Sequence, residues 1–264
     1  MIIHDQHVHS CYSFDSEQSI KEYLLKASEL GLSYFVLTDH CDLDYLDKGK
    51  DLFFDIKKRD LELENLQKEF KEIKILKGIE IGYKPSQLDR INEIISSNNF
   101  DLINLSLHEA DGIDYFVKEE FISRGIDNTL KNYFENEIKA VTSFNNYDVF
   151  SHFDYGFKTA FRIDSSIKID KYKKYLIKIM NVLIQKEKAL EINIKVQSFL
   201  PLEHTKYVLK LYKKLGGKYL TLSSDAHEIK FFRYNFDNYI ELIKSCGFDE
   251  LTYFVGRNKK TLKI

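Results

Sequence analysis

The segment YLTLSSDAH, residues 219–227, is a short apolar run that ends in two polar residues, Asp225 and His227. Side chains two residues apart in a β-strand point to the same side, so these two would face one way together. Six other apolar runs alternate with stretches of helical period, which is typical of a parallel sheet whose strands are joined by helices. These runs are MIIHDQHVH (1–9), YFVLTDH (34–40), IKILKGIEIGY (73–83), FDLINLSLH (100–108), YDVFSHFDY (147–155) and ALEINI (189–194).

Seven strands of this kind predict an α/β fold, a distorted (β/α)7 barrel with one strand fewer than the common eight. Between the first two runs, Ser19 and Glu22 form an SxxE capping box, and Gly31 stands where the helix would stop. The chain shows no linker, repeat or low-complexity segment, so we expect one TIM-like domain over residues 1–264. Further helical periods fall in residues 55–71, 88–95 and 172–183.

Composition restricts the class of protein. Apolar residues make up 44% and charged residues 30%, which is typical of a folded globular chain. Lysine and arginine number 39 against 41 acidic residues, so the net charge of −2 does not favour nucleic acid as a partner. There is no apolar run long enough to span a membrane and no secretory leader pattern. The three cysteines form no CxxC pair, which favours the reducing cytoplasm.

Nearly every predicted strand ends in a residue type that binds metals. The carboxyl ends of parallel barrel strands meet at one face, so these side chains would converge, while His4 and His204 remain as structural or surface residues. Imidazoles mixed with carboxylates suit zinc, manganese or iron, and two or three such ions would support hydrolysis by a metal-activated hydroxide. The strand-end residues are His7, His9, Asp39, His40, Glu80, His108, His152, Asp225 and His227.

These motifs resemble those of the polymerase-and-histidinol-phosphatase (PHP) family of metal-dependent phosphoesterases. The segment DQHVHSCYSFDS, residues 5–16, is similar to the family's first motif, an HxH pair followed by a third ligand, here Asp15. The other matching segments are TDH (38–40), GIEIGY (78–83), LSLH (105–108), SHFD (151–154) and SSDAH (223–227).

The resemblance implies a set of ligands and their roles. Glu80 would bridge two ions, and Asp39 would lie behind the ligands and orient one of them. Glu80, Asp225 and His227 would also take part in catalysis. The three implied ligand groups are His7, His9, Glu80 and Asp225; Glu80, His108 and His152; and Asp15, His40 and His227.

Across the whole chain, the order of features is most similar to the histidinol-phosphatase branch of the family. That branch hydrolyses L-histidinol phosphate, a small phosphorylated substrate, to L-histidinol and phosphate in histidine biosynthesis. Arg162 and Lys195 are candidate phosphate contacts. One departure is that the branch often has small residues and an arginine after EIN, whereas this chain has IKVQ at residues 194–197.

Three alternatives follow from the same residues. A metal amidohydrolase also begins with HxH but usually carries a bridging lysine on a strand, and none is evident. A PHP phosphoesterase for another phosphomonoester or for oligonucleotides would use basic and aromatic residues at the mouth, such as Tyr115, Phe116, Lys118 and Arg124. A PHP module that only binds a partner would be expected to lack ligands, and all nine are present.

Overall fold

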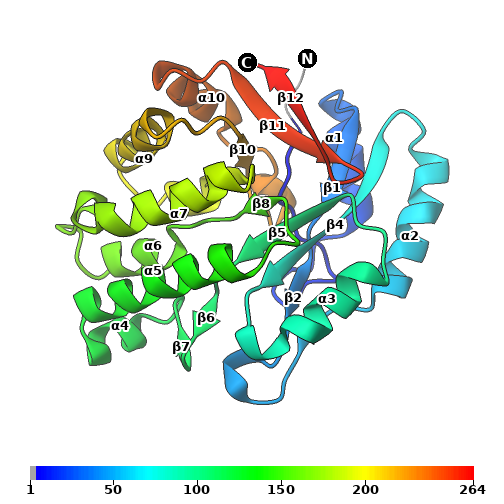
Figure 1. Ribbon diagram of the computed structural model, residues 1–264. Coiled ribbons are helices and arrows are strands. Elements are labelled where there is room, and N and C mark those ends of the chain that lie inside the picture. The colour runs from blue at the N-terminus through cyan, green and yellow to red at the C-terminus, as the bar shows by residue number, and fades with distance from the viewer. Residues whose placement is uncertain (1–3) are drawn as a thin grey trace.

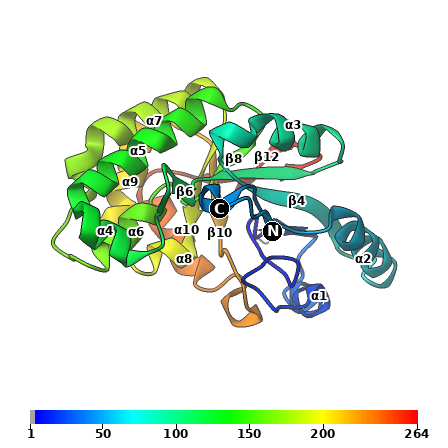
Figure 2. The same cartoon turned by 90° about the horizontal axis from the view of Figure 1, so that it is seen from below.

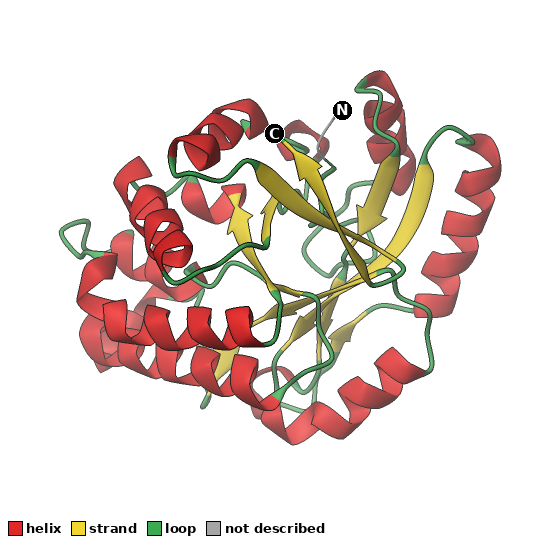
Figure 3. Cartoon of the chain, turned by 45° about the horizontal axis from the view of Figure 1, so that its top comes forward, coloured by secondary structure: helices red, strands yellow, loops and turns green. Residues whose placement is uncertain are grey.

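The protein is described by a computed structural model, which covers residues 4–264. Its centre is a parallel sheet surrounded by helices (Figures 1 and 3). From β4 onward, each strand pairs in parallel with the next around the barrel. These strands are β4 (Lys74–Gly82), β5 (Leu102–Ser106), β8 (Val149–Phe150), β9 (Ala189–Asn193) and β10 (Leu220–Ser223).

The N-terminal run closes the barrel between β10 and the run that holds β1 (Tyr34–Leu37) and β2 (His40–Asp42). Both β1 and β2 pair in parallel with β4. The predicted seven-stranded barrel is therefore confirmed, but among the described residues of the first run, 4–9, only Val8 forms a β-bridge, with Ala226. The closing bonds run from Asp225 N to His7 O, from His9 N to Ala226 O and from Thr38 N to Val8 O, each 2.9 Å long.

The predicted helices are present, with the expected cap at the first one. Ser19 Oγ accepts a hydrogen bond from Glu22 N and donates one to the Glu22 carboxylate, and Gly31 follows the helix with a φ of 66°. Helices α4 to α7 gather on one side of the barrel, opposite α1 and α2 (Figure 2). The helices are α1 (Ile20–Glu29), α2 (Ile56–Glu69), α3 (Leu88–Ser96), α4 (Lys118–Arg124), α5 (Ile126–Ser143), α6 (Tyr155–Phe161), α7 (Lys173–Gln185), α8 (Ile194–Gln197), α9 (Leu202–Lys214) and α10 (Phe236–Ser245).

Short elements decorate the loops. Strand β3 (Leu52–Phe53) pairs antiparallel with β2, and β6 (Glu109–Ala110) forms a small hairpin with β7 (Ile113–Asp114). Four 3-10 helices complete the described chain. They are η1 (Tyr45–Asp47), η2 (Pro85–Gln87), η3 (Ile169–Tyr172) and η4 (Ile229–Phe231).

A C-terminal hairpin of β11 (Glu250–Val255) and β12 (Asn258–Lys263) covers the end of the barrel where the strands begin. Its turn residues Gly256 and Arg257 both have positive φ, as a two-residue hairpin turn requires. Phe254 is buried in one apolar cluster with the first residues of several barrel strands. The hairpin thus seals one end and leaves the strand carboxyl ends as the open face.

The largest buried apolar cluster contains residues from Cys41 to Leu262, so the barrel and the C-terminal hairpin share one core. The organisation as a single domain over residues 1–264 stays a prediction, and its first three residues lie outside the described part. Among residues 4–264, no helix is long and apolar enough to cross a membrane.

Candidate active site

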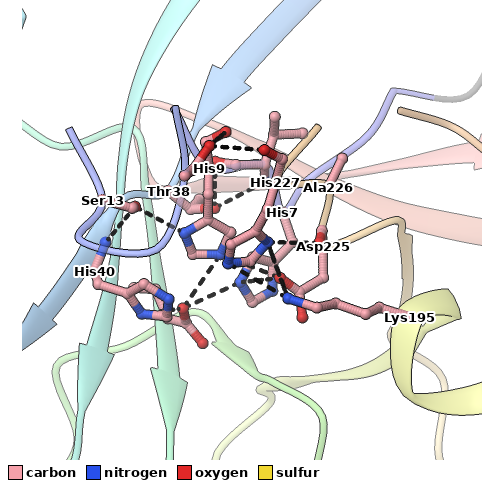
Figure 4. A network of polar contacts seen from close by, with 12 residues as sticks. His7, His9, Ser13, Thr38, His40, Lys195, Asp225, Ala226 and His227 are labelled. Atoms are coloured by element: carbon pink, nitrogen blue, oxygen red, sulfur yellow. Dashed lines mark hydrogen bonds and ion pairs between the residues drawn. The ribbon is translucent and has the colours of Figure 1, made fainter. Parts of the chain in front are cut away.

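The nine predicted ligands converge at the carboxyl ends of the barrel strands. In Figure 4, several of these side chains point toward one another from separate segments, with Lys195 beside them. His4 and His204 lie elsewhere and are buried: His4 packs against Tyr34, and His204 Nε2 contacts Asp154 Oδ2 at 2.6 Å. One cavity is lined by Phe14, Asp15, His40, Asp42, Tyr45, Glu80, His108, His152, Tyr155, Lys195, Asp225 and His227.

Glu80, fully buried on β4, lies at the centre of this cluster. Its two carboxylate oxygens face different histidines, as a bridging ligand requires. Oε2 lies 2.9 Å from His40 Nδ1, 3.3 Å from His7 Nε2 and 3.4 Å from His9 Nε2, whereas Oε1 lies 2.8 Å from His152 Nε2 and 3.3 Å from His108 Nε2.

Two more carboxylates, those of Asp225 and Asp15, contact histidines at the mouth of the barrel. Asp225 Oδ1 lies 3.2 Å from His9 Nε2, on the side of Glu80 Oε2. Asp15 joins His227 and His40, with its oxygens 2.9 Å from His227 Nε2 and 3.6 Å from His40 Nε2. All three ligand groups implied by the sequence are therefore brought together, and their role as metal ligands remains a proposal.

The donor atoms fit divalent metal ions. Atoms bound to one tetrahedral zinc at about 2.0–2.1 Å from it lie about 3.3 Å apart. In the first group, Glu80 Oε2 lies 3.3 Å from His7 Nε2 and 3.4 Å from His9 Nε2, while Asp225 Oδ1 lies 3.2 Å from His9 Nε2 and 4.0 Å from His7 Nε2. His7 Nε2, His9 Nε2 and Glu80 Oε2 are buried without a hydrogen-bond partner, which is costly unless a cation satisfies them.

Three of the imidazoles are held from behind so that Nε2 faces the cluster. His7 Nδ1 lies 2.8 Å from Glu191 Oε1, His9 Nδ1 3.0 Å from Ser13 Oγ, and His108 Nδ1 2.7 Å from Asp42 Oδ1. An oxygen that accepts the Nδ1 proton leaves the Nε2 lone pair free for a metal. Sequence reasoning missed Glu191 and Asp42, although Asp42 follows His40 at the two-residue spacing already noted for the ligand pairs.

The carboxylate of Asp39, predicted to orient a ligand, hydrogen-bonds to Ser10 and Ser13 and not to a proposed ligand. The backbone carbonyl of Asp39 accepts a hydrogen bond from Glu80 N at 3.1 Å. Asp39 Oδ1 accepts hydrogen bonds from Ser10 N at 2.7 Å and from Ser13 Oγ at 2.9 Å. Because Ser13 Oγ contacts His9 Nδ1, Asp39 reaches His9 through a serine. The predicted orienting role is thus indirect in this geometry.

The clustered charges shift pKa values in opposite directions. Burial, the largest single influence, would lower the pKa of His40, but the carboxylates of Glu80, Asp15 and Asp42 together outweigh it and raise that pKa to about 10. Burial would raise the pKa of Glu80, yet the imidazoles of His7 and His40 hold it well below its ordinary value. The carboxylate therefore stays ionised, and binding of divalent ions would release imidazole protons.

Of the two predicted phosphate contacts, the structure brings only Lys195 to the cavity. Its Nζ lies 2.9 Å from His227 Nδ1 and 3.5 Å from Asp225 Oδ1. Arg162 is exposed at the end of α6, does not line the cavity, and has its guanidinium carbon 5.2 Å from the ring centre of Phe199. This geometry gives the predicted phosphate contact of Arg162 no support.

Lys158 is a residue that the sequence reasoning missed. It is buried on α6, and its ammonium lies 4.0 Å from the ring centre of Tyr155, which lines the cavity. Burial, together with repulsion from Lys195, lowers the pKa of Lys158 to about 8. Its position six residues after the strand-end His152 was the sequence signal that could have found it.

A parallel barrel with imidazoles and carboxylates gathered around one cavity at its strand ends defines a metal-dependent hydrolase. Residues 5–195 match the model of the PHP domain. The chain belongs to the PHP family, because this match covers more than half of it.

Curated relatives are similar to this chain over nearly its whole length. A histidinol-phosphatase from Lactococcus lactis subsp. lactis is 34% identical over 266 residues, which cover 98% of each chain. A probable histidinol-phosphatase from Clostridium acetobutylicum is 26% identical, over 93% of this chain and 94% of the relative.

Solved structures agree with this assignment. The crystal structure of histidinol phosphate phosphatase from Lactococcus lactis, complexed with zinc, L-histidinol and phosphate, matches with a TM-score of 0.84 at 31% identity and covers 98% of both chains. A putative histidinol phosphatase from Listeria monocytogenes matches with a TM-score of 0.74 at 16% identity, over 89% of this chain and 99% of the other, and so supports the fold alone.

Proposed function

We propose that this chain hydrolyses L-histidinol phosphate to L-histidinol and phosphate, a step of histidine biosynthesis. The observation that carries the proposal is the convergence of eight ligand-type side chains around a ninth, Glu80, in a chain whose 34% identical relative is a histidinol-phosphatase. A similar solved structure holds zinc, L-histidinol and phosphate together.

The ligand groups suit two or three divalent ions, with zinc, manganese or iron as the candidates. When bound, such ions supply a water of lowered pKa as the nucleophile and positive charge for the phosphate oxygens. Each group draws on several segments of the barrel, with Glu80 shared between the first two. The proposed groups are His7, His9, Glu80 and Asp225; Glu80, His108 and His152; and Asp15, His40 and His227.

Lys195 and three aromatic residues that line the cavity, with Lys158 beside it, would bind and enclose the substrate. Lys195 and Lys158 place two ammonium groups near one side of the cluster, where they would stabilise charge on phosphate oxygens as the ester bond breaks. The rings of Phe14, Tyr45 and Tyr155 line the cavity and would exclude water around a compact substrate.

Substrate preference tests the proposal directly. We expect kcat/KM for L-histidinol phosphate to exceed that for p-nitrophenyl phosphate by roughly 10²-fold or more, since contacts to the rest of the substrate add about 3 kcal/mol in the transition state. Steady-state assays of phosphate release with both esters and with bis(p-nitrophenyl) phosphate measure this. A preference for the aryl ester or the diester would refute the substrate assignment and leave the metal-dependent hydrolase standing.

Replacement of the cavity lysine tests the phosphate contact. Lys195→Ala is expected to lower kcat/KM by roughly 10²-fold, because it removes a donor aimed at developing negative charge. Metal content should not change, since an ammonium is not a ligand. Arg162→Ala is the matched control and should keep near-native kcat/KM; if both variants lost activity equally, or neither did, the assignment to Lys195 would be wrong.

We also propose that the enzyme acts in the cytoplasm on this small substrate. All three cysteines are free, with Cys41 and Cys246 buried and Cys11 exposed, which suits a reducing compartment. The 39 basic and 41 acidic residues give no net attraction for nucleic acid.

A further inference from the structure

Glu191 touches two of the proposed ligands at once. It lies on β9 with no exposed surface, in the buried segment ALEIN. Its Oε1 lies 2.8 Å from His7 Nδ1, and its Oε2 accepts hydrogen bonds from the backbone N of His152 at 2.9 Å and from Asn193 Nδ2 at 3.1 Å. One carboxylate thus joins the N-terminal segment to the end of β8.

The contact with His7 sets which ring nitrogen is available. A carboxylate that accepts the Nδ1 proton leaves the lone pair on Nε2, and it also makes the imidazole a stronger ligand. His7 Nε2 is buried, has no hydrogen-bond partner and lies 3.3 Å from Glu80 Oε2. Glu191 therefore aims His7 at the Oε2 side of Glu80.

The contact with His152 supports an unfavourable backbone. His152 has a φ of 26°, a left-handed value that a residue with a side chain adopts only when its surroundings hold it there. Glu191 Oε2 accepts a hydrogen bond from His152 N, and the carbonyl of His152 accepts one from Tyr155 N at 2.7 Å. In that conformation His152 Nε2 lies 2.8 Å from Glu80 Oε1, the oxygen opposite to the one near His7.

We propose that Glu191 is a positioning residue that couples the two ion positions on either side of Glu80. It fixes the imidazole of His7 on one side and the backbone of His152 on the other, so a disturbance of Glu191 reaches both ions together. The inference rests on the proposed metal centre and is independent of which phosphate ester is the substrate.

Glu191→Gln separates this role from simple packing, because glutamine has the same shape but only one acceptor oxygen. If the amide nitrogen faces His7 Nδ1, the ring must carry its proton on Nε2, which then cannot bind a metal. If the amide nitrogen faces His152 N, two donors meet in a buried site. Either orientation disturbs one of the two ligands, His7 or His152. Because Glu80 is shared between the two ion positions, weaker binding at one position also weakens binding at the other.

The test strips the protein of metal with a chelator and titrates Zn²⁺ back against a competing indicator, without substrate. Glu191→Gln is expected to bind zinc with roughly 10- to 100-fold weaker affinity, and the ions next to Glu80 should weaken together. Native affinity, or weakening of one ion alone, would overturn the coupling. Loss of histidinol phosphate preference in the native enzyme would not bear on this result.

Asp148→Asn is the matched control. Asp148 is a buried carboxylate at the opposite end of β8, where it accepts hydrogen bonds from Ile103 N at 2.9 Å and from Arg257 Nε at 2.7 Å. Its amide variant should lose stability yet keep native zinc affinity, as circular dichroism and the same titration would show. Should Glu191→Gln not fold, Glu191→Asp retracts the carboxylate by one methylene, and native zinc affinity in that variant would equally overturn the proposal.

Discussion

Replacing Glu80 with alanine is expected to abolish measurable metal binding on both sides of its carboxylate and to lower kcat/KM by roughly 10³-fold or more, at least about 4 kcal/mol of transition-state stabilisation. The side chain is fully buried, and its oxygens lie within 3.4 Å of five imidazole nitrogens. A single change therefore removes the one carboxylate that faces all five imidazoles.

Elemental analysis of protein purified without chelator, alongside the phosphate-release assay, measures this effect. Glu109→Ala is the control, because Glu109 is another buried glutamate near the mouth and pairs with Lys84 at 2.6 Å instead of with a proposed ligand. The Glu109→Ala variant should keep its metal content. A Glu80→Ala enzyme that folds, retains its ions and works at near-native rate would show that Glu80 is not a bridging ligand.

Removal of the metal from the unmodified protein is expected to eliminate activity and lower the melting temperature. Ions that bind only the folded state stabilise it by about 2.7 kcal/mol at a free concentration 100 times Kd. For a domain of this size each kcal/mol corresponds to about 2–4 °C, so we expect the melting temperature to fall by roughly 5–10 °C. Buried atoms such as His7 Nε2 and Glu80 Oε2 would then lose the cation that satisfies them.

Zinc or manganese added back should restore both properties, whereas magnesium and calcium should restore them poorly, because the cluster is rich in imidazole and those ions prefer oxygen ligands. Differential scanning calorimetry and activity assays on the same samples measure the two effects. Full activity in protein shown by elemental analysis to contain no transition metal would contradict the proposed metal centre.

Much of the barrel could be predicted because its signals are local. Apolar runs, helix periods and the cap at Ser19 each depend on residues a few positions apart, and all are present in the structure. The C-terminal hairpin was not predicted, although the Gly256 and Arg257 turn lies between two strand-like runs. Its place over the barrel end depends on packing of Phe254 against distant strands, which no local pattern reveals.

The proposed phosphate contacts show where a sequence pattern is insufficient. Lys158 and Arg162 are four residues apart on one helix and so share a face, but they lie one turn, about 6 Å, apart along the axis. That single turn leaves Lys158 over Tyr155 beside the cavity and Arg162 over Phe199 outside it. Which of the two lies beside the cavity depends on where the helix begins relative to the mouth.

The sequence by itself determined the fold class, the strand ends and eight of the nine ligand-type residues, because strand periodicity and parallel topology direct strand-end side chains to one face. The ninth, Asp15, followed only from the resemblance to the PHP family's first motif. Only the tertiary structure decided which nitrogen of each imidazole faces the cluster and which carboxylate stands behind it. The contact of His7 with Glu191 joins residues 184 positions apart and exists only once the barrel has closed. Such pairings follow from the packing of whole strands against one another, so no pattern along a single strand contains them.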